Sequence, residues 1–324
     1  MDDGAPRIGL VLGAGGVAGG AFHAGVLAAL EEATGWDPRT AAVVVGTSAG
    51  SITGATLRAG LPAGDLLARA TDRPLSLEGQ RVVQRLGPVL RPPSLQVSRE
   101  RRPPAELAAT LARAARRPLA ARPWSLLASL IPDGSISTDM ISDGVAGIFP
   151  GTWPAAPLLI CAVRQSDGRR IVFGRSGHEP PMPQAVAASC AIPGFFRPVE
   201  VDGVPHIDGG VHSPTNADVL LDETPLDLVI VSSPMSRRGR RLPVAPDQAM
   251  RAWSSTLLDA EARRLRRRGI PLLALQPDDA VLAAMGQNAM DPRRRKATAE
   301  QSRTSTLVRL AEPRVADRLA RLSS

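Results

Sequence analysis

Ser48 lies in the sequence Gly46-Thr47-Ser48-Ala49-Gly50, which has the pattern G-x-S-x-G. The pattern falls between a β-branched run and a segment with helical spacing, so we expect a sharp turn that exposes the serine hydroxyl at a helix N-terminus. The helix dipole and free N–H groups there favour the negative charge that develops during acyl transfer. The motif therefore predicts a serine nucleophile, whereas a plain glycine–serine turn with Ser48 as the helix cap is the simpler alternative.

A second glycine cluster occupies residues 13–20 with the sequence GAGGVAGG, directly after the first expected strand. Consecutive glycines can turn several backbone N–H groups toward one anion. The spacing of Gly13, Gly15 and Ala18 also fits the dinucleotide pattern G-x-G-x-x-A, so two functions compete. A dinucleotide site normally has an acidic residue at the end of the second strand, where this chain has its G-x-S-x-G motif. We therefore favour an oxyanion hole, with a glycine turn needed only for packing as a third explanation.

Asp208 is the third candidate, because it follows an alternating segment and is followed by Gly209 and Gly210. Within that segment, Asp202-Gly203 is a strong signal for a two-residue hairpin turn. We expect the hairpin to bring the Asp208 carboxylate to a crevice at the sheet edge. An ordinary Asp-Gly turn explains the same letters without a function.

No histidine stands in an obvious catalytic setting. His23 lies on the apolar first helix, where a buried supporting residue is expected, and His212 follows Asp208 too closely to be a separate triad member. A base needs only hydrogen-bond reach and a suitable pKa. A Ser–Asp dyad with Asp208 as the base therefore fits better than a triad.

The elements that must position these residues alternate along the chain. Glycine turns link short buried strands to helices, which is the order expected of an α/β fold with a mainly parallel central sheet and helices on both faces. We expect one domain over residues 5–322, with an Arg- and Pro-rich insertion or lid at about 73–132. The expected strands are 7–12, 42–45, 158–163, 170–173, the hairpin 199–207, 226–231 and 271–276, and the expected helices are 22–32, 48–59, 104–116, 247–268 and 297–322.

Composition excludes some classes of protein. With 324 residues, 44% hydrophobic and 22% charged, the chain is long enough for a sizeable core and is not disordered. The net charge is +8, and all but one of the 39 basic residues are arginine. Aromatic residues make up only 3%, with no tyrosine, which gives little means of stacking on bases, so no nucleic-acid partner is expected.

The basic residues are concentrated in residues 58–122 and 237–324, whereas the motifs lie in acidic segments. The insertion combines arginines with apolar pieces such as Trp124-Ser125-Leu126-Leu127, so it could rest on an anionic membrane. A solvated arginine surface in an arginine-biased chain explains it equally well.

Cys161 and Cys190 are too few for a disulfide scaffold or a structural zinc site, so two buried reduced thiols are expected. The N-terminal segment lacks the features of a secretory signal. We therefore expect a cytoplasmic protein, with peripheral membrane contact as an option, and neither metal nor cofactor.

The three motifs, in this order, resemble the patatin-like phospholipase family. The resemblance runs through the glycine loop, the G-x-S-x-G motif, the block Ala188-Ser189-Cys190-Ala191-Ile192-Pro193-Gly194-Phe195-Phe196-Arg197-Pro198-Val199, and Asp208-Gly209-Gly210. The block is the most specific part, because it joins a helix end, a proline turn and the hairpin. Ala18 departs from the arginine that the family usually carries in its glycine loop.

The resemblance implies a three-layer fold and a hydrolase that cleaves phospholipid, lysophospholipid or other lipid esters. It implies Ser48 as the nucleophile, Asp208 as the base and the backbone N–H groups around Gly15, Gly16 and Val17 as the oxyanion hole. Gly13, Gly46, Gly50, Gly209 and Gly210 would support this geometry. A catalytically silent lipid-binding protein on the same fold, or less plausibly a dinucleotide-dependent oxidoreductase, are the alternatives.

Overall fold

The architecture was obtained as a computed structural model that describes residues 6–86, 131, 133–147, 149, 152–223, 225–239 and 246–319. The helix expected at 104–116, and the apolar segment expected at 124–131 apart from its last residue, lie outside these ranges. The same is true of most of the insertion at 73–132.

Eight strands in the described part form one sheet in the order β5-β6-β3-β2-β1-β7-β8, with β4 paired to β3. Five neighbours, β3, β2, β1, β7 and β8, run parallel, whereas β4, β5 and β6 form antiparallel pairs. The strands are Ile8–Leu12 (β1), Val43–Thr47 (β2), Leu158–Arg164 (β3), Arg170–Phe173 (β4), Val199–Val201 (β5), Val204–Asp208 (β6), Leu228–Ser232 (β7) and Leu272–Leu275 (β8). The expected α/β architecture with a mainly parallel sheet is confirmed.

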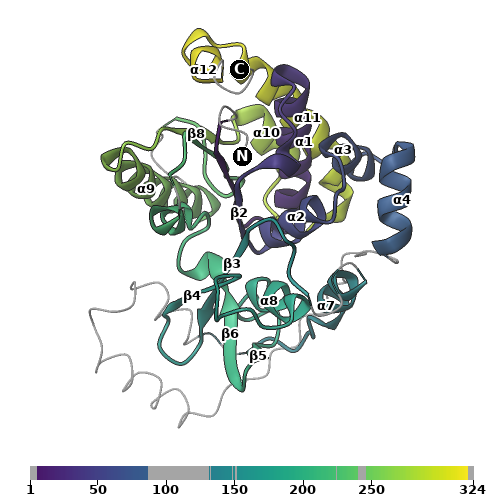
Figure 1. Cartoon of the computed structure of the whole chain (residues 1–324), viewed down its shortest axis with the longest axis vertical. Coiled ribbons are helices and arrows are strands. Elements are labelled where there is room, and N and C mark those ends of the chain that lie inside the picture. The colour runs from purple at the N-terminus through teal and green to yellow at the C-terminus, as the bar shows by residue number, and fades with distance from the viewer. Residues whose placement is uncertain are drawn as a thin grey trace.

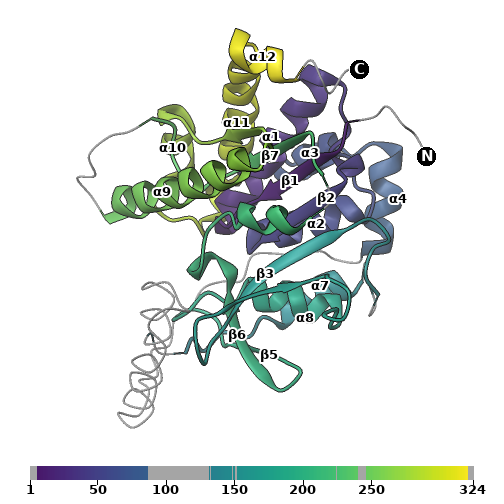
Figure 2. The same ribbon diagram turned by 60° about the vertical axis from the view of Figure 1, so that its left-hand side comes forward.

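Helices cover both faces of the sheet (Figures 1 and 2). Leu10, Leu12 and Val44 point into the core shared with α1 (Gly16–Thr34) and α2 (Ala49–Arg58). Their neighbours Val11, Val43 and Val45 point to the opposite core, which contains residues of α9 (Pro246–Arg267). Because side chains alternate along a strand, the continuous apolar runs of β1 and β2 supply both cores.

The remaining helices lie mostly on the α1 side, with α11 alongside α1 (Figure 2). They are α3 (Ala63–Ala70), α4 (Leu77–Leu86), α7 (Asp139–Ala146), α8 (Met182–Ser189), α10 (Asp279–Met285), α11 (Arg295–Leu310) and α12 (Pro313–Leu319). Among the described helices, none combines the length and the apolarity needed to cross a membrane.

Three expectations about helices were wrong in detail. The first helix begins at Gly16 rather than at residue 22, so most of the glycine cluster is helical. A regular helix, α4, lies in the segment expected to be irregular. The single C-terminal helix expected at 297–322 is two helices, because Pro313 cannot continue the hydrogen-bond ladder of α11.

Candidate active site

Ser48 occupies the sharp turn between β2 and α2. Its backbone has φ 53° and ψ −121°, a strained conformation for a residue with a side chain and the one expected of a nucleophile at a strand-to-helix turn. Gly50 makes the turn possible, because a Cβ atom there would lie 1.9 Å from the carbonyl oxygen of Leu12. The glycine thus lets α2 pack directly on the end of β1.

Asp208 is delivered by the β5–β6 hairpin. Asp202 and Gly203 both have positive φ, 51° and 73°, as a type I′ turn requires, so the expected hairpin is confirmed. The register pairs Thr47 with Cys161 and Asp208 with Ala162, while β4 pairs with the opposite edge of β3 along the same stretch, so β2 and β6 follow one another along a single edge of β3. Consequently the serine after Thr47 and the aspartate meet beside the middle of β3, and both line the same cavity.

The environment of Asp208 suits a base. Its side chain is buried, and burial raises the pKa of the carboxyl to about 6, although hydrogen bonds with Ser48 and with the Gly210 N–H oppose the rise. The Gly210 nitrogen lies 2.7 Å from Asp208 Oδ1. A carboxylate with this pKa is ionised at neutral pH and accepts a proton more readily than an exposed aspartate does.

The glycine loop presents a row of free donors beside Ser48. The N–H of Ala14 donates to Pro214 O at 2.8 Å and the N–H of Ala18 donates to Ala289 O at 2.9 Å. Between them, the N–H groups of Gly15, Gly16 and Val17 have no hydrogen-bond partner among the described residues. They are the first donors of α1, where a helix leaves its N–H groups unsatisfied and favours an anion.

Gly16 has φ +59°, and a Cβ atom at this position would lie 2.6 Å from Met290 Sδ. Both the conformation and the contact explain a glycine here. The loop is fixed from behind by His23, whose ring nitrogens lie 2.7 Å from Ser232 Oγ and 2.8 Å from Gly13 O. Burial lowers the pKa of His23 to about 4, so the ring is neutral. This placement fits the supporting role expected for His23.

The other predicted glycines surround the same turns. Gly13 follows β1, Gly46 lies within β2, and Gly209 follows Asp208 so closely packed on β3 that a Cβ atom would lie 2.1 Å from Cys161 O. The structure therefore brings every predicted site residue to one end of β1, β2 and β6.

Ser189, which belongs to the block that resembles the family, holds the backbone of Ser48 in place. The Ser48 N–H donates to Ser189 Oγ at 2.9 Å, and the Ser189 hydroxyl donates to Cys161 O at 2.6 Å. These bonds tie α8, β3 and the catalytic turn together. They also occupy the Ser48 N–H, so this group is not available as an oxyanion donor.

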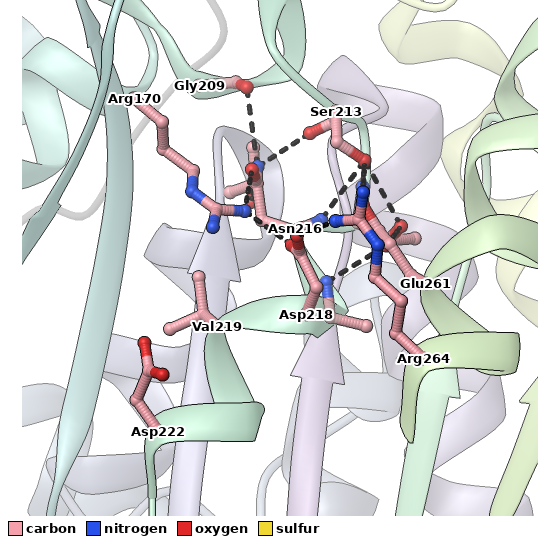
Figure 3. A network of polar contacts seen from close by, with 12 residues as sticks. Arg170, Gly209, Ser213, Asn216, Asp218, Val219, Asp222, Glu261 and Arg264 are labelled. Carbon is pink, nitrogen blue, oxygen red and sulfur yellow. Dashed lines mark hydrogen bonds and ion pairs between the residues drawn. The ribbon is translucent and has the colours of Figure 1, made fainter. Parts of the chain in front are cut away.

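Asn216 links the nucleophile strand to the Asp208 loop (Figure 3). Its Nδ2 amide lies 3.1 Å from Thr47 Oγ1, 3.3 Å from Gly209 O and 2.6 Å from Ser213 O. The first partner precedes Ser48 and the second follows Asp208. No sequence pattern pointed to this asparagine, because its partners are distant along the chain.

Glu261 of α9 supports the same segment (Figure 3). Its buried carboxylate accepts hydrogen bonds from Ser213 Oγ at 2.6 Å, Thr215 Oγ1 at 2.5 Å and the Ala217 N–H at 3.0 Å. Burial, and then the charge of Asp218, raise the pKa of Glu261. We call Ser213, Thr215, Asn216, Asp218 and Glu261 the supporting network.

Asp218 completes the supporting network with two arginines. It forms ion pairs with Arg170 of β4 and with Arg264 of α9, the latter at 2.9 Å. The two cations balance the negative charge that Asp218 and Glu261 bring into the interior.

Two cavities meet at Ser48. The smaller, about 260 Å³, extends between α1, α2 and α3, and the larger, about 480 Å³, opens beside Asp208. Ser48, Gly16, Ile192 and Met290 line both. The larger cavity is otherwise apolar, with Met235, Met250 and Trp253 among its walls. The larger cavity therefore offers an apolar space beside Ser48.

Within the described ranges, no cluster of three or more metal-binding side chains occurs. Cys161 and Cys190 are buried free thiols, and burial raises the pKa of Cys161 to about 12 and that of Cys190 further. Both remain protonated and unreactive at neutral pH.

Comparisons with known proteins identify a family for this sequence. The sequence model of the family described as patatin-like phospholipase matches residues 10–221. No curated protein matches the chain. Among solved structures, the type III effector protein ExoU is similar at 16% sequence identity with a TM-score of 0.39. That similarity covers 98% of this chain and 54% of ExoU, so the chain spans about half the length of that protein.

Proposed function

The chain belongs to the patatin-like phospholipase family, and on that premise we propose that it is a serine acyl hydrolase that cleaves lipid esters through Ser48 and Asp208. The observation that carries the proposal is that Ser48 and Asp208 line one cavity together with the glycine loop, whose three N–H groups have no partner among the described residues. A nucleophile, a base and an oxyanion site are the parts that acyl transfer requires.

In the proposed reaction, Asp208 accepts the Ser48 proton while Ser48 Oγ attacks the ester carbonyl carbon. The N–H groups of Gly15, Gly16 and Val17 hold the resulting oxyanion, each contributing roughly 3 kcal/mol in comparable sites. Collapse breaks the bond to the alcohol, which leaves with the proton from Asp208. Water then attacks the acyl-enzyme with Asp208 again as the base, which releases the fatty acid and restores Ser48.

The shape of the site supports a lipid substrate. Ile131 and Met250 line the larger cavity and are each 43% exposed, so the cavity has an apolar rim at the surface. Such a rim can receive an acyl chain from a membrane or a micelle. We include peripheral contact with an anionic membrane, reached from the cytoplasm, and phospholipid or lysophospholipid as the substrate class in the proposal.

Replacing Ser48 with alanine tests the function. We expect Ser48→Ala to lower kcat on phospholipid, lysophospholipid, triacylglycerol and p-nitrophenyl esters by about 10³-fold or more, because no nucleophile remains. A fluorophosphonate should label the wild type and not this variant. Ser166→Ala, at an exposed serine in the β3–β4 turn, is the control and should react like the wild type. Full esterase activity in Ser48→Ala would overturn the proposal, and no turnover by the wild type would favour a silent lipid-binding protein.

A further inference from the structure

Arg69, which lines the smaller cavity, has no role in the proposed acyl-transfer mechanism. The walls of this cavity include parts of α1, α2, α3, α7 and α11, and the lining residues of α1 extend from Gly16 to Ala24, about 12 Å of helix. Ser48 lies at one part of this wall, and Arg69 and Arg295 also line the cavity. The two arginines therefore line the same cavity as Ser48.

Arg69 lacks the partners that buried arginines in this protein otherwise have. Its Nη1 atom is buried, and the guanidinium forms no hydrogen bond with any described residue. By contrast, the Nη atoms of Arg58 donate to the carbonyls of Arg39, Ala41 and Pro157, each at 2.8 Å. Arg251 likewise donates to Pro234 O at 2.8 Å. Arg69 is half-buried, but its buried Nη1 atom without an acceptor is unfavourable, so its retention calls for a ligand.

The acidic residues closest in sequence to Arg69 are engaged elsewhere. Asp65, one turn earlier in α3, accepts from the Ser76 N–H at 2.8 Å and from the Ser76 hydroxyl at 2.6 Å. Asp72 pairs with Arg295 at the surface. The polar wall residues Thr53 and Thr56 donate their hydroxyls to carbonyls of α2. These neighbours leave the charge of Arg69 uncompensated inside the cavity.

Burial, and then the charge of Arg295, lower the pKa of Arg69. Two positive charges that repel each other across a cavity attract an anion placed between them. Arginine is suited to this role, because its planar fork matches the oxygens of a phosphate or a carboxylate.

The two cavities at Ser48 therefore differ in charge. The larger one is lined by apolar side chains and has the Asp208 carboxylate as its charged group among the described residues, whereas the smaller one contains both arginines. We propose that the smaller cavity binds an anionic oxygen group of the ester substrate, a phosphate or a carboxylate, with Arg69 as its main contact and Arg295 as the second. The larger cavity then holds the acyl chain. The identification of the ligand as part of the substrate rests on the proposed function. The anion site in the smaller cavity does not depend on it.

Binding of small soluble ligands to the inactive Ser48→Ala protein tests the site without turnover. The ligands are hexyl phosphate, hexanoate and hexanol, all as monomers, measured by isothermal titration calorimetry. We expect one or both anions to bind roughly 10- to 100-fold more tightly than the alcohol, because a charge-assisted hydrogen bond contributes that much. The preferred anion identifies the group that the substrate carries.

Two further substitutions in the Ser48→Ala background assign the effect to Arg69. Arg69→Gln should remove the preference for the anion, whereas Arg266→Gln, at an exposed arginine of α9, changes the net charge equally and should keep it. With Ser48 intact, the ratio of kcat/KM for a monomeric short-chain phospholipid to that for an uncharged ester should fall about tenfold in Arg69→Gln. Anions that bind no better than hexanol, or equally well to Arg69→Gln, would overturn the proposal.

Thermal unfolding separates a ligand site from a structural role. Arg69 lies in the last turn of α3, where its charge could instead stabilise the helix dipole. If it serves a ligand, Arg69→Met removes an uncompensated buried charge and raises the melting temperature without ligand. A lower melting temperature would contradict the proposal. Anion binding without any esterase activity would retain the site and refute only the proposed function.

Discussion

Two groups of buried charges flank Ser48, and the chain treats them in opposite ways. In the supporting network, each carboxylate has several partners: Glu261 accepts three hydrogen bonds and Asp218 pairs with two arginines. On the cavity side, Arg69 has an unsatisfied buried Nη1 atom. The supporting network reaches Ser48 through the bond between Asn216 and Thr47, and Arg69 lines the smaller cavity together with Ser48.

The contrast distinguishes residues that fix the backbone of the site from a residue that we propose binds a ligand. A complete set of hydrogen bonds fixes a backbone in one geometry, because every alternative leaves a polar group unsatisfied. An incomplete set costs stability and is retained where a ligand completes it. Substitutions in the supporting network should therefore lower stability and catalysis together, whereas substitution of Arg69 should separate them.

The largest loss of stability is expected for Glu261→Ala. The change removes the acceptor of three buried donors and leaves a cavity, so we expect unfolding to become easier by about 3–5 kcal/mol. Urea denaturation followed by circular dichroism measures it. Thr256→Ala, at an exposed position of α9, is the control and should change stability by less than about 0.5 kcal/mol. Glu261→Gln should lie between the two, because an amide nitrogen cannot accept from the Ala217 N–H.

A smaller loss of stability, together with a loss of catalysis, is expected for Asn216→Gly. Asn216 has φ 52°, which glycine adopts without strain, so the substitution removes the amide and keeps the backbone conformation. Without the bonds to Thr47 and Gly209, the nucleophile and the base lose their common support. We expect kcat to fall roughly 10- to 100-fold with little change in KM.

The rate of fluorophosphonate labelling of Asn216→Gly should fall in parallel with kcat, because labelling also depends on the alignment of Ser48 and Asp208. An unchanged kcat together with a lower melting temperature would reduce Asn216 to a purely structural role.

The smallest effect is the pH dependence set by Asp208, whose carboxylate accepts a hydrogen bond from the Gly210 N–H. Burial raises its pKa to about 6, and only the ionised form can accept the serine proton. We therefore expect kcat/KM for an uncharged ester to be constant above pH 6 and to fall about tenfold per pH unit below it. A profile that stays flat to pH 4.5 would show that another group is the base.

Sequence patterns predicted the site residues that belong to short motifs. They did not predict the residues whose roles depend on contacts between distant parts of the chain. Ser48 and Asp208 could be predicted from short motifs, because a sharp turn and a type I′ hairpin each require particular residues at fixed positions. The start of the first helix was placed too late, because glycine-rich turns rarely continue as helices, and here the packing of Gly16 against Met290 decides.

Asn216, Glu261 and Arg69 gave no signal at all. Their roles depend on contacts between residues tens to hundreds of positions apart, or on the lack of such contacts, and a pattern along the chain does not contain either. The same holds for Ser189, which bonds to a residue 141 positions away.

Met290 and Arg295 shape the cavities at Ser48, yet both lie beyond residue 221, where the family match ends. The nucleophile, the base and the glycine loop all lie before it. The residues proposed to break the ester bond and the residues of one cavity wall therefore lie on separate stretches of the chain. Recombination after β8 would replace Met290 and Arg295 and keep every residue of the supporting network. The shape of the cavities could then change during evolution while the residues proposed for proton transfer stay the same.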